Sequence, residues 1–426
     1  MSPYPHQLPP VIGLLDVGTS KIACLMLARQ CDGAWAPVGF GHQSSRGLKA
    51  SVVVDANAAE DAVRATISQA EHMAGTALDA VVLSAACGRI ASTHAAVGCE
   101  LDAAGPRGRP VTTADVGRLL VAGRDYAERD DRAALHVDWI AARCDGAPLD
   151  PADIGSNTGR ACRRLSLDVH AVTADRSPLR HLVHVAERCN QHVVAICPVP
   201  LTSGLAVTTD AERALGAAVV DMGAGSTSLA LFVCGRLVAV HVIPIGANHI
   251  TYDLTRALGV SITEAERIKK ICAMVDLAHP SAADAISYHA QGNDHAHTKQ
   301  ATRAEITTII TSRLDALLRQ VGARIEQAAI PQHLTGDVVL TGGGSMLAGI
   351  AVRASAILGR PARCTPPARR IGVPDVLLQP AFATIIGMQS LVSDIRFAAG
   401  GIWLGDGHAQ PLPAAANGGS WLRRRF

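Results

Sequence analysis

The chain has 426 residues, of which 48% are hydrophobic and 18% are charged. This length suggests two or more domains, and the composition excludes a disordered chain. The formal net charge of +2 argues against a nucleic-acid binder that acts through its whole surface, so any electrostatic function is local.

Strand and helix patterns alternate in the first part of the chain. Residues 11–28 predict two β-strands joined by a tight turn, and a helical pattern runs from Asp55 to residue 75. A buried strand is predicted over 79–87. From 88 to 164 the periodicity weakens while charge, glycine and proline increase, which indicates an inserted module with a small core of its own.

Regular α/β patterning returns at residue 165. A Ser261–Glu264 capping box is expected to open one of the later helices. The expected elements are a strand (165–174), a helix (178–189), a strand (192–199), a helical stretch (201–214), three strands within 216–246, a helix to Cys272, a polar loop (278–300), a long helix (302–328), a strand (337–347), a helix (348–359), a closing helix (381–396) and a flexible linker (398–420).

Eleven cysteines are scattered along the chain, and no two have CxxC spacing. Several lie in apolar runs, such as those around Cys24 and Cys197, where cysteine acts as a small hydrophobic residue. We therefore expect a reducing cytosol and no cysteine zinc site. Neither a signal peptide nor an apolar run of about 18 residues is visible, so contact with a membrane would be peripheral.

One sequence plan occurs twice. LLDVGTSKIACLML and VVDMGAGSTSLALFV each contain an apolar strand, a turn that begins with Asp-x-Gly, and a second apolar strand. Their aspartates, Asp16 and Asp221, are separated by about half of the chain. A fold duplicated in this way places two aspartate-bearing hairpins face to face across a cleft.

Both turns carry groups suited to phosphate. Glycines allow backbone N–H groups to point into a concavity, hydroxyl groups add donors, and a lysine adds positive charge. Asp16 and Asp221 are consistent with a hydrated Mg²⁺ between them and the phosphate oxygens. One copy alone would be an ordinary glycine-containing hairpin, but the matching pair favours a phosphate site. The residues are Gly18, Thr19, Ser20 and Lys21 in the first turn and Gly223, Gly225, Ser226 and Thr227 in the second.

A glycine-rich loop follows one predicted strand and precedes a helix. Gly342, Gly343 and Gly344 let the backbone lie flat against a planar group or a phosphate without interference from Cβ atoms. Alone, this segment would be a loose strand–helix connection. Together with the two turns, and in this order, it predicts a nucleotide-binding cleft.

These three elements resemble the actin/Hsp70/sugar-kinase ATPase fold. Over essentially its whole length the chain resembles the FtsA family of bacterial cell-division actin homologues. The resemblance implies an α/β, actin-like (ribonuclease H-like, duplicated) two-domain ATPase fold with an inserted small α+β domain (SHS2-like). The matching segments are GLLDVGTSKIACLML, EHMAG, VVDMGAGSTSLALF, ITEAERIKK, VVLTGGGSML, AFATIIGM, the insert 88–164 and the tail WLRRRF.

The resemblance also implies a division of the chain into subdomains. The expected parts are 1A (1–87, 165–199 and 361–397), the inserted domain 1C (88–164), 2A (200–246 and 305–360), 2B (247–304), the linker (398–420) and a membrane-targeting tail (421–426).

By the same resemblance, ATP and Mg²⁺ are the expected cofactors. Glu266 and Lys269 match the positions that hold ribose and adenine in related ATPases, although an ion pair on a solvated helix face is the alternative. The resemblance assigns phosphate contacts to both turns, Mg²⁺-water contacts to Asp16 and Asp221, and the adenosine loop to Gly342, Gly343, Gly344 and Ser345.

The sequence offers no group that would position water for hydrolysis. In fast relatives a Glu or Gln lies in the segment that corresponds to CPVPLTSGLAV, near Val199. No Glu, Gln, Asp or His occurs from Val199 to Thr209. We expect tight ATP binding with slow or undetectable turnover rather than a metabolic enzyme, and no catalytic residue is assigned.

The family resemblance implies a protein that polymerises and tethers the ring protein FtsZ to the inner face of the cytoplasmic membrane at the division site. The FtsZ C-terminal peptide would bind at 247–304, and the insert would contact neighbouring subunits or later division proteins. The alternatives are an FtsA-like adaptor of pilus assembly and a phosphotransferase or Hsp70-like ATPase. An anionic membrane would contact Trp421, Leu422, Arg423, Arg424, Arg425 and Phe426, and no nucleic acid is expected.

Overall fold

The computed structural model describes the greater part of the chain. The described residues are 9–101, 108–155, 160–272, 275, 280–290, 297–328, 334 and 336–393. The expected linker (398–420) and membrane-targeting tail (421–426) lie outside the described residues.

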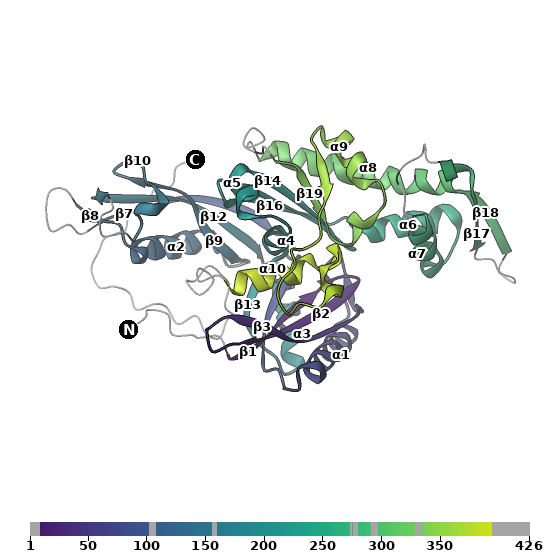
Figure 1. Cartoon of the computed structure of the whole chain (residues 1–426), viewed down its shortest axis with the longest axis horizontal. Helices are drawn as coiled ribbons and strands as arrows, with labels where there is room; N and C mark the ends of the chain where they lie inside the picture. The colour runs from purple at the N-terminus through teal and green to yellow at the C-terminus, as the bar shows by residue number, and fades with distance from the viewer. Residues whose placement is uncertain are drawn as a thin grey trace.

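A five-stranded sheet, in the order β13-β6-β1-β2-β3, organises the first half of the fold (Figure 1). β1 (Val11–Val17) and β2 (Lys21–Arg29) form an antiparallel hairpin, and β3 (Trp35–Ser44) pairs antiparallel with β2. β6 (Ala80–Ala85) and β13 (His192–Pro198) add parallel strands on the other side of β1. Nearly every residue of β1, β2 and β6 is buried, as expected for strands covered on both faces.

The same strand order recurs in the second half. β14 (Ala217–Met222) and β15 (Thr227–Val233) form the second antiparallel hairpin, and β16 (Arg236–Ile243) pairs antiparallel with β15. β19 (Val338–Thr341) and β20 (Ala362–Cys364) continue on the other side of β14 in parallel. Both halves therefore have the strand order third, second, first, fourth, fifth, which confirms the duplication predicted from the two aspartate turns.

The insert extends the second sheet sideways. β7 (Ala91–Glu100), β9 (Arg132–Cys144) and β12 (Arg164–Asp175) are long antiparallel strands, and β7 meets β16 through one bridge, between Ala91 and His241. The helix α2 (Thr113–Ala127) packs on this sheet and closes a separate hydrophobic core (Figure 1). The short strands are β8 (Arg109–Pro110), β10 (Ala147–Pro148) and β11 (Ala161–Cys162).

Two helices join the halves of the fold. α4 (Val199–Val207) and α10 (Ala383–Val392) pack on one another between the two sheets, and almost all of their residues are buried. Their contact is very close, because a Cβ atom added to Gly387 would lie 1.6 Å from the carbonyl oxygen of Thr202. Gly204 allows a similarly close approach, because a Cβ atom added there would lie 2.6 Å from the ring of Phe232 in β15. The central core therefore contains residues of both sheets.

The remaining helices cover the outer faces and form a side lobe. α1 (Ala56–Ala74) begins at Asp55, whose side chain accepts hydrogen bonds from the N–H groups of Asn57 and Ala58. The other helices and strands are α3 (Arg176–Arg188), α5 (Asp210–Leu215), α6 (Ala247–Leu258), α7 (Ile262–Ile271), α8 (Arg303–Gln327), α9 (Ile350–Leu358), β4 (Leu48–Lys49), β5 (Val52–Val53), β17 (Ala285–Ala290) and β18 (His297–Thr302), with 3₁₀ turns at Pro151–Asp153, Pro280–Ala283, Gly343–Met346, Asp375–Leu378 and Pro380–Phe382.

The prediction of an irregular loop over 278–300 is wrong. β17 and β18 form an antiparallel hairpin in the side lobe, from the pair Ala285–Thr302 to the pair Ala290–His297. Tyr288 and Ala290 are buried in β17, whereas its other side chains are exposed or partly exposed. A strand that buries so few side chains carries little of the apolar alternation by which strands are recognised.

Two other expected elements have different limits, and one expected capping box is incomplete. The helical stretch 201–214 is two helices, because Thr209 and Glu212 form a capping box that starts α5. The strand predicted over 337–347 ends at Thr341 and is followed by a 3₁₀ turn. Ser261 does cap α7, but the Glu264 carboxylate binds Arg267 and the N–H of His289 instead of completing the box.

Among the described residues, no helix is both long enough and apolar enough to cross a membrane.

The contact between α4 and α10 gives a stability test. The substitution Gly387→Ala should lower the free energy of unfolding by about 2 kcal/mol or more in urea denaturation, because the added methyl group forces two buried helices apart. The control Gly322→Ala lies on α8 with only Leu358 Cδ2 nearby, at 3.4 Å. It should be neutral or stabilise by up to about 1 kcal/mol through helix propensity. Equal effects of the two substitutions would contradict this packing.

Candidate functional site

The two hairpin turns predicted to bind phosphate have the same local shape. A Cβ atom added to Gly18 would lie 2.9 Å from the carbonyl oxygen of Lys21, and one added to Gly223 would lie 2.8 Å from that of Ser226. The N–H of Gly18 donates to the Lys21 carbonyl, which closes the first turn. A different bond holds the second turn in place: the hydroxyl group of Thr227 donates to the carbonyl of Ile245, in the segment that precedes α6. The duplication therefore extends to the backbone of the turns.

The turns also touch one another. A Cβ atom added to Gly225 would lie 2.4 Å from Thr19 Oγ1. The hydroxyl oxygens of Ser51 and Ser226 are 3.2 Å apart, and the N–H of Ser51 donates to Thr19 Oγ1. The Gly225 backbone and the hydroxyl groups of Thr19, Ser51 and Ser226, from both halves of the chain, are thus brought together at one place.

The two aspartates lie beneath these turns. Asp16 and Asp221 are 6% and 7% exposed, and the Ser84 hydroxyl donates to Asp16 Oδ1 over 2.6 Å. Burial, reinforced by the negative charge of Asp16, raises the pKa of Asp221 to about 6. The carboxylates are therefore close enough to repel, and a cation between them would relieve that repulsion.

Lys21 supplies positive charge at the same place. Its Nζ lies 3.7 Å from Asp16 Oδ2 and 4.7 Å from the centroid of the Phe382 ring. Phe382 belongs to the 3₁₀ turn that precedes α10, so the closing segment of the fold fixes one side of the lysine.

The glycine-rich loop leaves β19 beside the second aspartate. Gly342 has φ +80°, and a Cβ atom there would lie 2.2 Å from Asp221 Oδ1. The Ser345 hydroxyl donates to the Gly342 carbonyl and holds the loop in a tight turn. Gly343 differs from its neighbours, because the nearest atom to an added Cβ is that of Ala381 at 3.9 Å. A methyl group therefore fits at Gly343, with Ala381 in ordinary van der Waals contact.

Glu266 and Lys269 lie on α7 and are bound to each other. Lys269 Nζ is 2.6 Å from Glu266 Oε1 and 2.8 Å from Thr251 Oγ1. In this structure the two side chains thus form the ion pair that was the alternative to contacts with ribose and adenine. The pair is still connected to the second turn, because Lys269 Nζ also contacts the Ala247 carbonyl at 3.4 Å, and the N–H of Ala247 donates to the Gly223 carbonyl.

Several residues at this site were missed by sequence reasoning. Thr384 of α10 donates to Asp221 Oδ2 at 3.4 Å, and the buried Thr341 hydroxyl has no hydrogen-bond partner among the described residues. Ala50 and Ser51 have φ angles of +47° and +65°. These residues follow no motif, although backbone strain of this kind is often found beside functional sites.

The residues present fit a magnesium–nucleotide complex. Two buried carboxylates suit a hydrated Mg²⁺, and hydroxyl groups with one lysine suit phosphate oxygens. The partnerless Thr341 hydroxyl and the room for a methyl group at Gly343 leave capacity for a ligand. In α4, which begins at Val199, the only polar side chains are Thr202 and Ser203, and both donate to carbonyl groups of their own helix or its N-cap.

The strand order, the paired turns and the glycine-rich loop define an actin-like fold. In agreement, the structure resembles the solved PilM-PilN type IV pilus biogenesis complex, with a TM-score of 0.59 and 16% identity over 91% of this chain and 99% of that one. It also resembles MreB5 of Spiroplasma citri bound to ADP, with a TM-score of 0.54 and 13% identity over 89% of this chain and 95% of that one. At these identities the likeness concerns the fold alone.

Sequence comparison gives the family. The family model described as cell division protein FtsA matches residues 218–387. The chain is 32% identical to the cell division protein FtsA of Agrobacterium fabrum over all of this chain and 97% of the relative. It is 30% identical to the FtsA of Pseudomonas aeruginosa, over 89% of this chain and 88% of the relative. It is 26% identical to the FtsA of Escherichia coli K12, over 97% of this chain and 96% of the relative. The chain belongs to the FtsA family, as its motifs predicted.

The crowding at Gly342 gives a second stability test. Gly342→Ala should cost roughly 2–4 kcal/mol in urea denaturation, because strain at positive φ is added to a collision with the Asp221 carboxylate. The control Gly235→Ala also has positive φ, +77°, but no atom lies within 4 Å of the added methyl group. It should cost only about 1 kcal/mol. If the two substitutions cost the same, the loop does not press on Asp221.

Proposed function

We propose that this chain binds ATP with Mg²⁺ between its two hairpin turns and acts as an actin-like cell-division protein. The observation that carries the proposal is the meeting of the turns, with Asp16 and Asp221 buried beneath them and Lys21 beside them. MreB5, which shares the fold, is described as bound to ADP in one solved structure and to AMPPNP in another.

Each part of the site has a separate task in this proposal. Backbone N–H groups and hydroxyls of the turns, with Lys21, bind phosphate oxygens. Asp16 and Asp221 would hold a hydrated Mg²⁺, which would supply positive charge to offset that of the phosphates and the two carboxylates. The loop of Gly342, Gly343 and Gly344, with Ser345, lies against the adenosine. Opening the Glu266–Lys269 ion pair would free both side chains for ribose and adenine.

We further propose that hydrolysis is slow or undetectable. Hydrolysis needs a side chain that orients water towards the γ-phosphate. The segment expected to provide it is α4, which carries no Glu, Gln, Asp or His: its polar side chains are Thr202 and Ser203, both bonded to backbone carbonyls, and Ser203 also lies against the Asp221 carboxyl. The nucleotide then acts as a structural element that closes the two halves of the fold.

Family membership supports a proposal for the cellular role. The relatives at 26–32% identity are named cell division protein FtsA, which favours division over pilus assembly. We propose that the chain polymerises and connects FtsZ to the membrane, with the FtsZ C-terminal peptide bound at 247–304. The insert (88–164) would contact neighbouring subunits or later division proteins. The tail 421–426 would bind anionic lipid at the inner face of the cell membrane.

The open position at Gly343 provides a direct test of nucleotide binding. Gly343→Ala should leave the unfolding free energy nearly unchanged, because its methyl group meets no atom closer than 3.9 Å. It should lower the affinity for Mg²⁺-ATP at least tenfold in calorimetric titration, since the methyl group occupies the space proposed for adenosine. Gly322→Ala serves as the control with unchanged affinity. Wild-type affinity in a folded Gly343→Ala variant would contradict this placement.

The tail can be tested by sedimentation with vesicles. Trp421→Ala and Phe426→Ala should each reduce pelleting with anionic liposomes several-fold while ATP binding is retained, because the aromatic rings provide the interfacial contact. Asn417→Ala, in the preceding linker, is the matched control and should pellet like the unmodified chain. Pelleting that is indifferent to removal of residues 421–426 would refute the anchor.

A further inference from the structure

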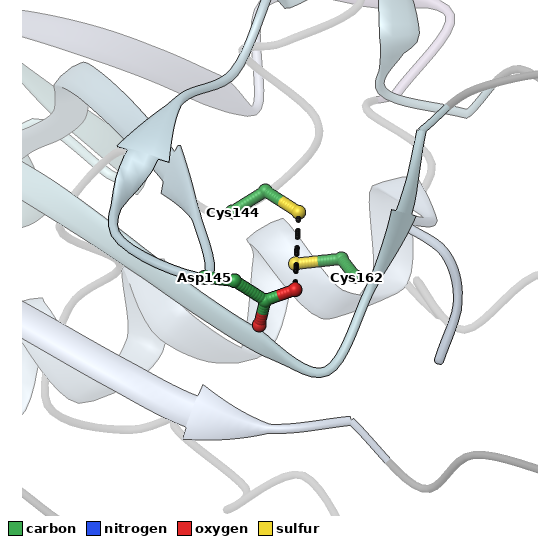
Figure 2. Close-up of side chains that lie close together, drawn as sticks. All are labelled: Cys144, Asp145 and Cys162. Atoms are coloured by element: carbon green, nitrogen blue, oxygen red, sulfur yellow. Dashed lines mark hydrogen bonds between the residues drawn. The ribbon is translucent and has the colours of Figure 1, made fainter. Parts of the chain in front are cut away.

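A second group of chemically reactive side chains lies in the insert, outside the proposed nucleotide site. Cys144 is the last residue of β9, Asp145 begins the turn to β10, and Cys162 is the last residue of β11. The two sulfur atoms and one carboxylate oxygen all lie within 4.8 Å of one another. Figure 2 shows the three side chains directed towards a common point.

The backbone brings this group together. Asp145 and Gly146 have φ angles of +50° and +86°, which make the tight turn that pairs Ala147 with Cys144. The Asp145 carboxylate then accepts hydrogen bonds from the N–H groups at 163 and 164, the shortest at 2.8 Å. The end of β9 is thereby fixed beside the end of β11.

Both thiols are buried. Cys144 and Cys162 are 0% exposed, and their sulfurs donate only weak hydrogen bonds, among them Cys162 Sγ to the Arg164 carbonyl at 3.1 Å. Burial, with the neighbouring Cys144 and Asp145, raises the pKa of Cys162 to about 12. A thiol held neutral is a poor nucleophile, so Cys162 is not suited to attack a disulfide in the buried state.

We propose that Cys144, Asp145 and Cys162 bind one zinc ion. Two sulfurs and a carboxylate form a donor set that suits zinc, with a fourth position left for water. Bonds of about 2.3 Å to sulfur and 2.1 Å to oxygen place tetrahedral ligand atoms roughly 3.5–3.8 Å apart. Cys144 Sγ already lies 3.8 Å from Asp145 Oδ2. Binding converts both thiols to thiolates and releases two protons to solvent.

The ion would add a direct link between two parts of the insert that already meet through hydrogen bonds of Asp145. Cys144 and Asp145 belong to the β9–β10 hairpin, and Cys162 belongs to the two-stranded β8–β11 sheet. Sequence spacing gave no sign of the site, because its ligands come from separate strands rather than from one CxxC turn. The inference does not depend on the proposed function.

Metal binding by the whole chain tests the proposal. The exposed cysteines are first replaced (Cys31→Ser, Cys234→Ser and Cys364→Ser) to remove adventitious ligands. After reduction and removal of metal, zinc should bind with one equivalent per chain, and cobalt(II) should give a thiolate charge-transfer band. Cys144→Ser and Cys162→Ser should each lower zinc affinity at least 100-fold, and Asp145→Asn about tenfold. Cys87→Ser, at a buried cysteine outside the group, should not change it.

A second measurement covers variants that fail to fold. In the unsubstituted chain, one equivalent of zinc should slow backbone hydrogen exchange at residues 144–146 and 161–164, but not around Cys31, as followed by mass spectrometry of the peptides. The proposal is overturned if no equivalent of metal binds, if the two serine substitutions leave affinity unchanged, or if zinc gives no protection. A Cys144–Cys162 disulfide that persists under thiol reductant would also overturn it, in favour of a structural cross-link.

Discussion

Two buried carboxylates, one from each half of a duplicated fold, are the constraint on which the rest of the structure depends. Asp16 and Asp221 lie close enough for the charge of one to raise the pKa of the other. Such an arrangement is costly unless a cation or a proton compensates it. Ser84, Lys21 and the hydroxyl of Thr384 provide part of that compensation. The repulsion that these groups do not compensate is the physical reason to expect a magnesium–nucleotide complex at this place.

The two halves can meet in this way because helices between the sheets approach very closely. α4 and α10 are in contact at Gly387, where no larger residue fits without movement of the backbone. The segment before α10 also places Phe382 against Lys21. A ligand between the turns therefore acts on the same helices that hold the sheets together. Through them, nucleotide binding would be coupled to the relative position of the lobes, which is the property that nucleotide-dependent assembly requires.

The sequence predicted the features that depend on a repeated motif. It did not predict those that depend on contacts between residues far apart in the chain. The repeated Asp-x-Gly turns were sufficient to predict the duplicated fold, and the structure brings both turns and the glycine-rich loop together. That they bind a nucleotide stays a prediction. The β17–β18 hairpin was missed because its strands bury few side chains. Ser51 and Thr384 join the site only through tertiary contacts, and Cys144 and Cys162 meet only after separate strands have paired. The break before α5 depends on one capping threonine, Thr209, within an otherwise continuous helical pattern.

Hydrogen exchange with and without Mg²⁺-ATP tests the central claim most directly, because it reads the two turns and the loop separately in the unmodified chain. The account predicts that the nucleotide slows backbone exchange at residues 16–21, 221–227 and 341–345 together, with smaller protection in α4 and α10. Protection at only one of the two turns, or unchanged exchange at all three segments under saturating nucleotide, would contradict a site shared between the halves.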